Sequence, residues 1–227
     1  MLQHLGRQEH QPNRDHEMSA SPFKTVIVLP GASLDLTTLE TVKTELGITD
    51  TDNDAWLQSK ITQSSVAIAS ACRRVFQQET IADYFNLGWR SCDDVLILSR
   101  YPVEEVVSVV ESNSVLPADQ YEFQSSNGML FRMRGDCRSS WTGGRIAVTY
   151  SAGYELLQTL PHDLEQACIL LVKQNYFAKT RDPLIKSVAI PGVSTYDYWV
   201  GSTGKGGGGG MPPEVQTLIE PYKTIAQ

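Results

Sequence analysis

The period of the hydrophobic pattern changes twice along this chain, and this change limits the possible folds more than any other feature. Apolar residues recur at spacings of three and four over 37–46, 54–74, 161–179 and 213–225. Between 80 and 150, short runs rich in β-branched and aromatic residues alternate with turn residues. The first pattern is typical of amphipathic helices and the second of strands. The sequence therefore predicts an α+β fold, a helical frame with an antiparallel β-subdomain inserted near 80–150.

The first two helices carry start and stop signals. Thr37 and Glu40 have the spacing of a capping box, and Gly47 is suited to end the first helix. Asp54 and the acidic residues before it favour the start of the second helix, because carboxylates stabilise the positive end of a helix dipole. We expect helix 54–74 to pack against helix 161–179 through one apolar set: Leu57, Ile61, Ile68, Leu164, Cys168 and Leu171.

Turn residues divide the predicted β-subdomain. Asn127-Gly128 separates Tyr121–Gln124 from Met129–Met133. Asn-Gly is a preferred dipeptide of the two-residue type I′ turn, so we expect a tight hairpin here. Asn113 and its serine neighbours predict a further turn.

The C-terminal region differs in composition from the rest. Residues 184–199 are apolar and aromatic but lack helical periodicity, and five glycines at 206–210 are typical of a flexible linker. A short amphipathic segment follows. We accordingly divide the chain into three parts: an N-terminal tail over 1–33 that can be flexible, a main domain over 34–182, and an extended arm over 183–227 with a glycine-rich linker and a terminal short helix.

Composition argues against several classes of function. The formal net charge is −7, whereas a protein that grips nucleic acid through its phosphates needs clustered Lys and Arg. The four cysteines lie far apart with no C-x-x-C pair, so we expect reduced structural thiols rather than zinc ligands or disulfides. No run of about 18 apolar residues is present, so no membrane span is expected. The sequence predicts no metal, no cofactor and no membrane contact.

No motif has the spacing that catalysis requires. The segment around Gly204-Lys205 has the outline of a phosphate-binding loop, but Trp199 stands where the first glycine belongs. The paired carboxylates at 93–94 and 104–105 fall on predicted strands, where adjacent side chains point to opposite faces. We therefore expect a protein that is not an enzyme.

A series of short segments, taken in order, resembles a known family. The segments lie at helix ends, after strands and around turns, over roughly residues 34–225: Leu36-x-x-Leu39-x-x-Val42, Asp52-x-Asp54, Cys72-Arg73-Arg74-Val75-Phe76, Leu98-x-Arg100-Tyr101-Pro102-Val103, Val148-x-Tyr150-x-Ala152-Gly153-Tyr154, Leu160-Pro161-x-Asp163-Leu164, Arg181-Asp182-Pro183 and Leu218-x-x-Pro221-Tyr222-Lys223. This order resembles the head-tail connector (adaptor) proteins of tailed bacteriophages and gene transfer agents.

The resemblance implies a structural role in a virus particle. Members of that family form a ring of identical subunits, implied to be a dodecamer, in the neck of the virion. They bind the portal protein on one side and a stopper or tail-completion protein on the other, and DNA passes through the lumen without sequence-specific binding. A chain of this kind is made in the host cytoplasm. The six apolar residues of the helix pair are then candidates for either the core or the wall of the ring.

The resemblance also implies that the C-terminal region binds the portal. We expect that contact to use seven apolar and aromatic residues of the arm: Val193, Tyr196, Tyr198, Trp199, Val215, Leu218 and Tyr222. Tyr and Trp are enriched at interface hot spots. On this hypothesis, deletion of 200–227 leaves a folded protein. Two alternatives stay open at this stage: another virion completion protein, such as a stopper or tail-completion protein, or a nucleotide- or nucleic-acid-processing phage enzyme.

Overall fold

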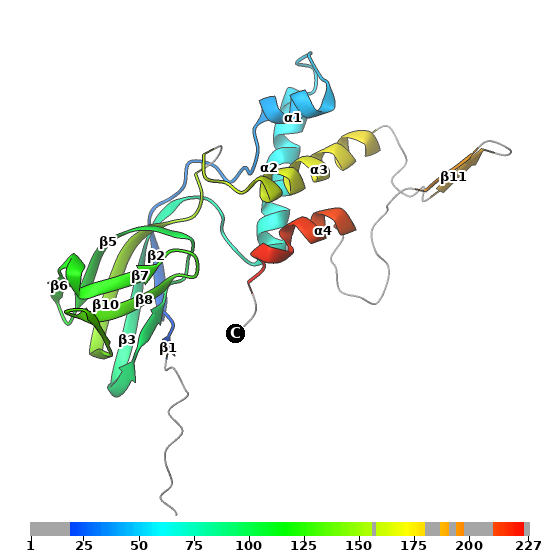
Figure 1. Cartoon of the computed structure of the whole chain (residues 1–227). Coiled ribbons are helices and arrows are strands. Elements are labelled where there is room, and N and C mark those ends of the chain that lie inside the picture. Colours follow the sequence, from blue (N-terminus) through cyan, green and yellow to red (C-terminus); the bar gives the residue numbers. More distant parts are fainter. Residues whose placement is uncertain (1–18, 156–157, 180–186, 191–193, 198–210, 225–227) are drawn as a thin grey trace, which may run out of the picture. The chain divides into compact units, whose positions relative to one another are not determined.

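The computed structural model describes residues 19–155, 158–179, 187–190, 194–197 and 211–224 (Figure 1). The chain divides into two compact units, each built from segments far apart in the sequence. A β unit contains Met1–Val28 and Ile81–Ser151, and a helical unit contains Leu29–Thr80 and Ala152–Gln227. The α+β class predicted from the hydrophobic pattern is confirmed. Within the described residues, no helix is long and apolar enough to cross a membrane.

Besides a short hairpin described below, the helical unit contains four helices and one 3-10 turn among its described residues: α1 (Leu39–Leu46), α2 (Asp54–Cys72), α3 (His162–Ala178), α4 (Pro213–Ile219) and η2 (Glu220–Tyr222). The cap of α1 is Thr38, whose hydroxyl accepts from the Thr41 amide at 3.1 Å. The prediction of Thr37 as the capping residue is therefore wrong by one position. The Thr37 hydroxyl is buried and instead donates to Glu165 on α3 at 3.2 Å. Gly47 ends α1 with φ +68°, as its residue type predicts.

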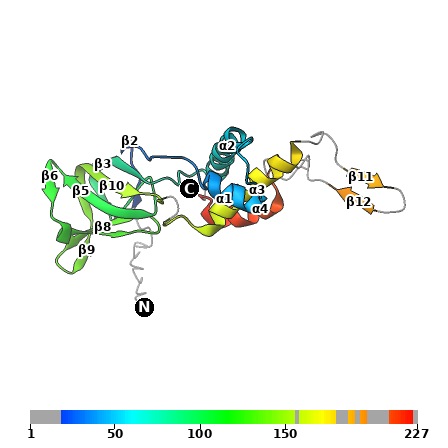
Figure 2. The same cartoon turned by 90° about the horizontal axis from the view of Figure 1, so that it is seen from above.

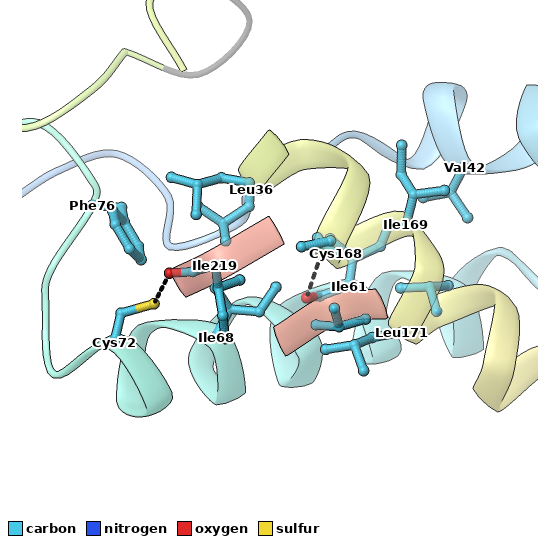
Figure 3. Packing of buried hydrophobic residues seen from close by; sticks show 14 of the residues in the cluster. Leu36, Val42, Ile61, Ile68, Cys72, Phe76, Cys168, Ile169, Leu171 and Ile219 are labelled. Atoms are coloured by element: carbon cyan, nitrogen blue, oxygen red, sulfur yellow. Dashed lines mark hydrogen bonds between the residues drawn. The ribbon is translucent and has the colours of Figure 1, made fainter. Parts of the chain in front are cut away.

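One apolar core holds the four helices together (Figure 3). Buried side chains of α2 and α3 alternate along their contact, and Val42 of α1 joins them. The helix α3 is apolar nearly all round because α1, α2 and α4 all pack against it. Two thiols fill small spaces in this core as weak hydrogen-bonding groups, Cys168 beside Ser65 and Cys72 beside the Ile219 carbonyl.

The C-terminal helix is part of this core. Val215 is fully buried and Ile219 is 1% exposed, and the Thr224 amide donates to the Cys72 carbonyl at 3.0 Å. We expected the amphipathic segment over 213–225 to be kinked at Pro221 and to dock separately from the main domain. The structure ends α4 at Ile219 and continues it as η2, but α4 packs against α3 and its Ile219 carbonyl lies beside Cys72 of α2. Pro221 explains the change of helix type, because proline cannot donate the hydrogen bond that a continuing α-helix requires.

The β unit contains two five-stranded sheets. One has the order β1-β4-β8-β7, with β9 beside β8, and the other has the order β2-β3-β10-β5-β6. The strands are β1 (Ser19–Ala20), β2 (Lys24–Leu29), β3 (Glu79–Asp93), β4 (Val95–Ile97), β5 (Val103–Glu111), β6 (Ser114–Leu116), β7 (Tyr121–Gln124), β8 (Met129–Arg134), β9 (Cys137–Ser139) and β10 (Trp141–Ala152), with a 3-10 turn at Ala118–Gln120. The Trp141 indole on one sheet donates to the Leu130 carbonyl on the other, at 3.3 Å. Pairs along β4, β7, β8 and β9 are antiparallel, but β1 pairs parallel to β4.

Part of the expected N-terminal tail belongs to these sheets. The tail predicted over 1–33 includes β1 and β2, and β2 lies at the edge of its sheet beside β3. The Phe23 amide donates to the Tyr84 carbonyl at 3.0 Å, and the Thr25 hydroxyl donates to Asp83 at 2.6 Å. The run of β-branched residues at 25–28 fits a pleated strand. Residues 1–18 lie outside the described part of the chain.

The turn predicted around Asn113 is confirmed and is a tight hairpin turn, whereas the one predicted at Asn127-Gly128 is not. Ser112 and Asn113 both have positive φ (+49° and +68°) and join β5 to β6 as a two-residue turn. Between β7 and β8, Gln124 pairs with Met129, so four residues form the loop and Gly128 alone has positive φ. The type I′ turn predicted at Asn127-Gly128 is therefore wrong. The Asn127 side chain instead accepts from the Met129 amide at 3.2 Å.

Backbone-to-backbone packing joins three segments within the helical unit, close to where the chain passes to and from the β unit. The Tyr154 amide donates to the Phe76 carbonyl at 2.7 Å, and the Gln78 amide donates to the Tyr154 carbonyl at 3.1 Å. Gly153 has φ +112°, and a Cβ atom there would lie 2.2 Å from the Gln77 carbonyl oxygen. A Cβ at Gly31 would lie 2.7 Å from the Gln78 carbonyl oxygen. Glycine is therefore required at 153 by both conformation and space.

This geometry predicts different outcomes for two glycine substitutions. Gly47→Ala should lower the free energy of unfolding by on the order of 1 kcal/mol, because φ is positive there but nothing lies within 4 Å of the added methyl. Gly153→Ala should lower it by at least about 2 kcal/mol more, because the methyl also meets main-chain atoms that cannot move aside. Urea unfolding of both variants measures the difference. Equal losses would show that the close approach at Gly153 is absent.

The packing of α4 predicts that its apolar side is needed for stability. Ile219→Ala should destabilise the protein by about 2–5 kcal/mol, as expected for a buried aliphatic side chain. Thr217→Ala, at an exposed position of the same helix, is the matched control and should cost much less. If Ile219→Ala left the urea midpoint at the wild-type value, α4 would not be docked in the core.

Candidate functional site

The six residues predicted to pack between the helices all lie in the apolar core. Leu57, Ile61, Ile68, Leu164 and Cys168 are fully buried, and Leu171 is 8% exposed. Burial raises the pKa of the Cys168 thiol to about 11, which keeps it protonated and unreactive at neutral pH. Within a single chain these side chains face one another. Any surface that meets a partner must be found elsewhere.

The seven residues predicted for the portal contact fall into two groups. Val193, Tyr198 and Trp199 lie outside the described residues, and Tyr196 is described through its backbone in β12. The other three belong to the core region, where Leu218 and Tyr222 are half-buried and Val215 is fully buried. The Tyr222 ring lies edge-to-face with Phe76, at 6.3 Å between centroids. Deleting 200–227 would remove this packing, so we now expect the truncated protein to be destabilised rather than to keep its fold unchanged.

The backbone of the arm forms a small hairpin. Strands β11 (Ser187–Ile190) and β12 (Ser194–Asp197) are antiparallel, with Val188 opposite Tyr196 and Ala189 opposite Thr195. They make a two-stranded sheet of their own. A two-stranded hairpin has little stability alone in water. Contact with another surface is the usual way to stabilise one.

An aromatic cluster lies between α2 and α3, with Trp56 and Tyr176 half-buried and Phe177 exposed. Tyr176 makes edge-to-face contacts with Trp56 and Phe177, at centroid distances of 6.2 and 5.7 Å. The ammonium groups of Lys60 and Lys179 lie 5.6 and 5.1 Å from the Trp56 ring. Phe177 is 66% exposed. Rigid aromatic groups beside cations suit a protein contact. Sequence reasoning missed this cluster, although the adjacent aromatics at 176–177 were a visible signal.

A pocket of about 330 Å³ opens in the helical unit beside the Gly153 junction. Its walls include Leu34, Phe76, Tyr154 and Leu160, with Gln77 and Glu155 as polar members. Leu34 is 53% exposed, so the apolar lining reaches the surface. A pocket of this size and lining can accept an apolar side chain of a partner.

The β unit contains a buried acid–hydroxyl cluster that sequence reasoning also missed. The fully buried Asp83 carboxylate accepts from Thr25, from the Ser99 amide and hydroxyl, and from Tyr150, at 2.6 to 2.8 Å. Burial, and then the Asp83 charge, raise the pKa of the Tyr150 phenol far above its usual value. The phenol therefore stays protonated as a donor. Four donors use the acceptor positions of the carboxylate, which is the arrangement of a structural charge rather than a free base.

No group of three or more His, Cys, Asp or Glu side chains comes together to hold a metal ion in the part of the chain that the structure describes. The paired carboxylates of the sequence do not act together either. Glu104 and Glu105 are both exposed on β5, while Asp93 is buried and Asp94 is exposed. Asp94 accepts from the Ser140 hydroxyl at 2.6 Å.

The acid–hydroxyl cluster predicts that removing the Tyr150 hydroxyl lowers the stability of the fold. Tyr150→Phe removes one donor from a buried carboxylate, and should cost about 1–3 kcal/mol in urea unfolding. The control is Tyr121→Phe, at a partly exposed position of β7, which should change stability little. If the two variants were equally stable, Asp83 would not depend on the Tyr150 hydroxyl.

A family model described as "Head completion protein" matches residues 35–225. Among solved structures, the chain is similar to one in "Virion of native gene transfer agent (GTA) particle", with TM-score 0.54, 20% identity, and coverage of 89% of this chain and 96% of that chain. No curated protein matches the chain.

Two further structures show a similar fold. The first, "Neck of empty GTA particle computed with C6 symmetry", gives TM-score 0.53, 19% identity, and coverage of 90% of this chain and 97% of that one. The second, "Neck of native GTA particle computed with C12 symmetry", gives TM-score 0.51, 19% identity, and the same coverage of 90% and 97%. At these sequence identities, the structural similarity shows a shared fold and nothing more.

Proposed function

This chain belongs to the head completion protein family, and we propose that it forms a ring in the neck of a tailed phage particle, between the portal and the tail. As a member of that family it is a structural subunit of the virion. The single observation that carries the proposal is the family match over residues 35–225. It covers the elements of both units from α1 to η2, while β1 and β2 precede the matched residues.

The ring is supported by the similar chains. They come from neck structures whose descriptions name sixfold and twelvefold symmetry. A closed ring of identical subunits needs two different surfaces on each subunit, one for each neighbour. We propose twelve copies for this chain, with DNA passing through the lumen. The formal charge of −7 suits such a passage, since it provides no general attraction for phosphate groups.

The portal contact is proposed for the arm that contains the β11–β12 hairpin. Because Val215 is buried in the core, the end of the chain is an unsuitable place for that contact. The hairpin pairs only its own two strands in the described sheets, and Tyr196 on β12 is of a residue type enriched at hot spots. The opposite side of the ring is proposed to meet a stopper or tail-completion protein.

A structural role without catalysis completes the proposal. The buried acid–hydroxyl cluster in the β unit has its acceptors occupied by Ser99, Tyr150 and Thr25. Its side chains stabilise the fold and take no part in a reaction.

If the β11–β12 hairpin binds the portal, its deletion should abolish portal binding without lowering the stability of the fold. Deletion of 187–197, joining Lys186 to Tyr198, spares α3 and α4, so the melting temperature should stay at the wild-type value. The variant should no longer join portal-bearing heads, measured as copies of the chain per purified particle. Deletion of the five glycines at 206–210 is the matched control and should leave joining intact. Normal joining by the hairpin deletion would show that another surface binds the portal.

A further inference from the structure

The strand β2 leaves an unusual edge on the β unit. It ends the sheet order β2-β3-β10-β5-β6, and Phe23, Ile27 and Val28 beside or within it are 63%, 51% and 57% exposed. An edge strand offers unpaired backbone groups, and proteins usually protect such an edge with charges, proline or a covering segment. Here the edge is apolar and carries a single charge, Lys24. We call these residues, 23–28, the β2 edge.

The opposite end of the same sheet has matching features. The last strand, β6, pairs with β5 only over Val109–Glu111, so the first half of β5 also lies at the sheet end. Val107 on β5 is 58% exposed and Val115 on β6 is 70% exposed. Figures 1 and 2 show β2 and β6 on different sides of the β unit. The amide and the carbonyl of Val103 are already bonded to Ser125, so we call Glu104–Glu111 and Ser114–Leu116 the β5–β6 edge.

The distribution of exposed apolar side chains singles out these two edges. Five large apolar residues of the β unit are strongly exposed among those described, and all five belong to one edge or the other. The edges also differ in charge. Lys24 is exposed on the β2 edge, while Glu104 and Glu105 are exposed on the β5–β6 edge. The two edges are therefore complementary in charge and similar in apolar character.

We infer that the β2 edge of one subunit binds the β5–β6 edge of the next copy of this chain, extending the sheet from subunit to subunit. The inference rests on the proposed ring, because a closed ring needs two different and complementary surfaces on each subunit. Strand addition at an edge supplies backbone hydrogen bonds, and the exposed valine, isoleucine and phenylalanine side chains supply apolar contact. A contact between two β2 edges would bring no carboxylate to Lys24, because residues 23–28 contain no acidic side chain.

Variants of each edge test the contact. Ile27→Asp with Val28→Asp alters the β2 edge, and Val107→Asp with Val115→Asp alters the β5–β6 edge. All four positions are exposed, so both variants should keep the wild-type melting temperature. Each alone should form rings at least tenfold less readily than wild type, measured by native mass spectrometry or as copies per portal-bearing head. Val66→Asp, at a 45% exposed position of α2 in the helical unit, is the control and should assemble normally.

A mixture of the two edge variants distinguishes head-to-tail pairing from the alternatives. Each variant keeps one intact edge, so the mixture should give one-to-one pairs that cannot close into a ring. Self-paired dimers of the Val107 and Val115 variant would overturn the inference in favour of β2–β2 pairing. A lowered melting temperature with normal rings for the β2 variant would overturn it too, since the edge would then be covered within its own chain.

The wild-type protein separates this inference from the proposed function. If wild type never forms a ring, even on portal-bearing heads, the proposed function fails and this inference fails with it. If wild type forms rings and both edge variants do so equally well, only the edge contact is wrong.

Discussion

The two-unit architecture depends on the backbone junction at Gly153. The chain passes between the helical unit and the β unit three times, so each unit is assembled from distant segments. In the helical unit the residues before β3 and after β10 are joined directly, through hydrogen bonds of Tyr154 with Phe76 and Gln78. This approach leaves no room for a side chain at Gly153. The junction thus holds the segment after α2 beside the segment that leads toward α3, and so allows a β-rich insertion within a helical core.

The sequence predicted those parts of the fold that depend on local chemistry. Helix positions followed from apolar spacing, and the six core residues from its phase along helices 54–74 and 161–179. The capping residue was misplaced by one, because Thr37 and Thr38 are both suitable caps and only the tertiary bond of Thr37 to Glu165 separates them. Asn127-Gly128 suits a tight turn by residue type, but Gln124 pairs with Met129 and makes a four-residue loop there. This register is set by the pairing of whole strands, which a dipeptide does not show.

The sequence did not predict features that depend on contacts between residues far apart in the chain. The β2 strand was assigned to a tail, because a short apolar run near a polar terminus carries no information about the strand beside it. The terminal helix was correctly seen as amphipathic, but amphipathicity indicates that one face is buried without saying against what. Its apolar face packs against the core of the same chain and is not free to bind another protein. The aromatic cluster around Tyr176 also needs two helices in place before it exists as a surface.

Two exceptions to the usual burial pattern occur in the β unit, and they are consistent with an assembling subunit. A charged side chain, Asp83, is fully buried and held by four donors, while large apolar side chains such as Ile27 and Val115 lie exposed. The buried charge is satisfied within one chain, so it needs no partner. The exposed valine and isoleucine side chains at the sheet ends gain stability only when covered. Because each edge is short and carries charge, a single pairing would be weak, and closure of a ring would add a second contact to every subunit. Such contacts would favour the complete ring over free pairs even though two free subunits associate only weakly.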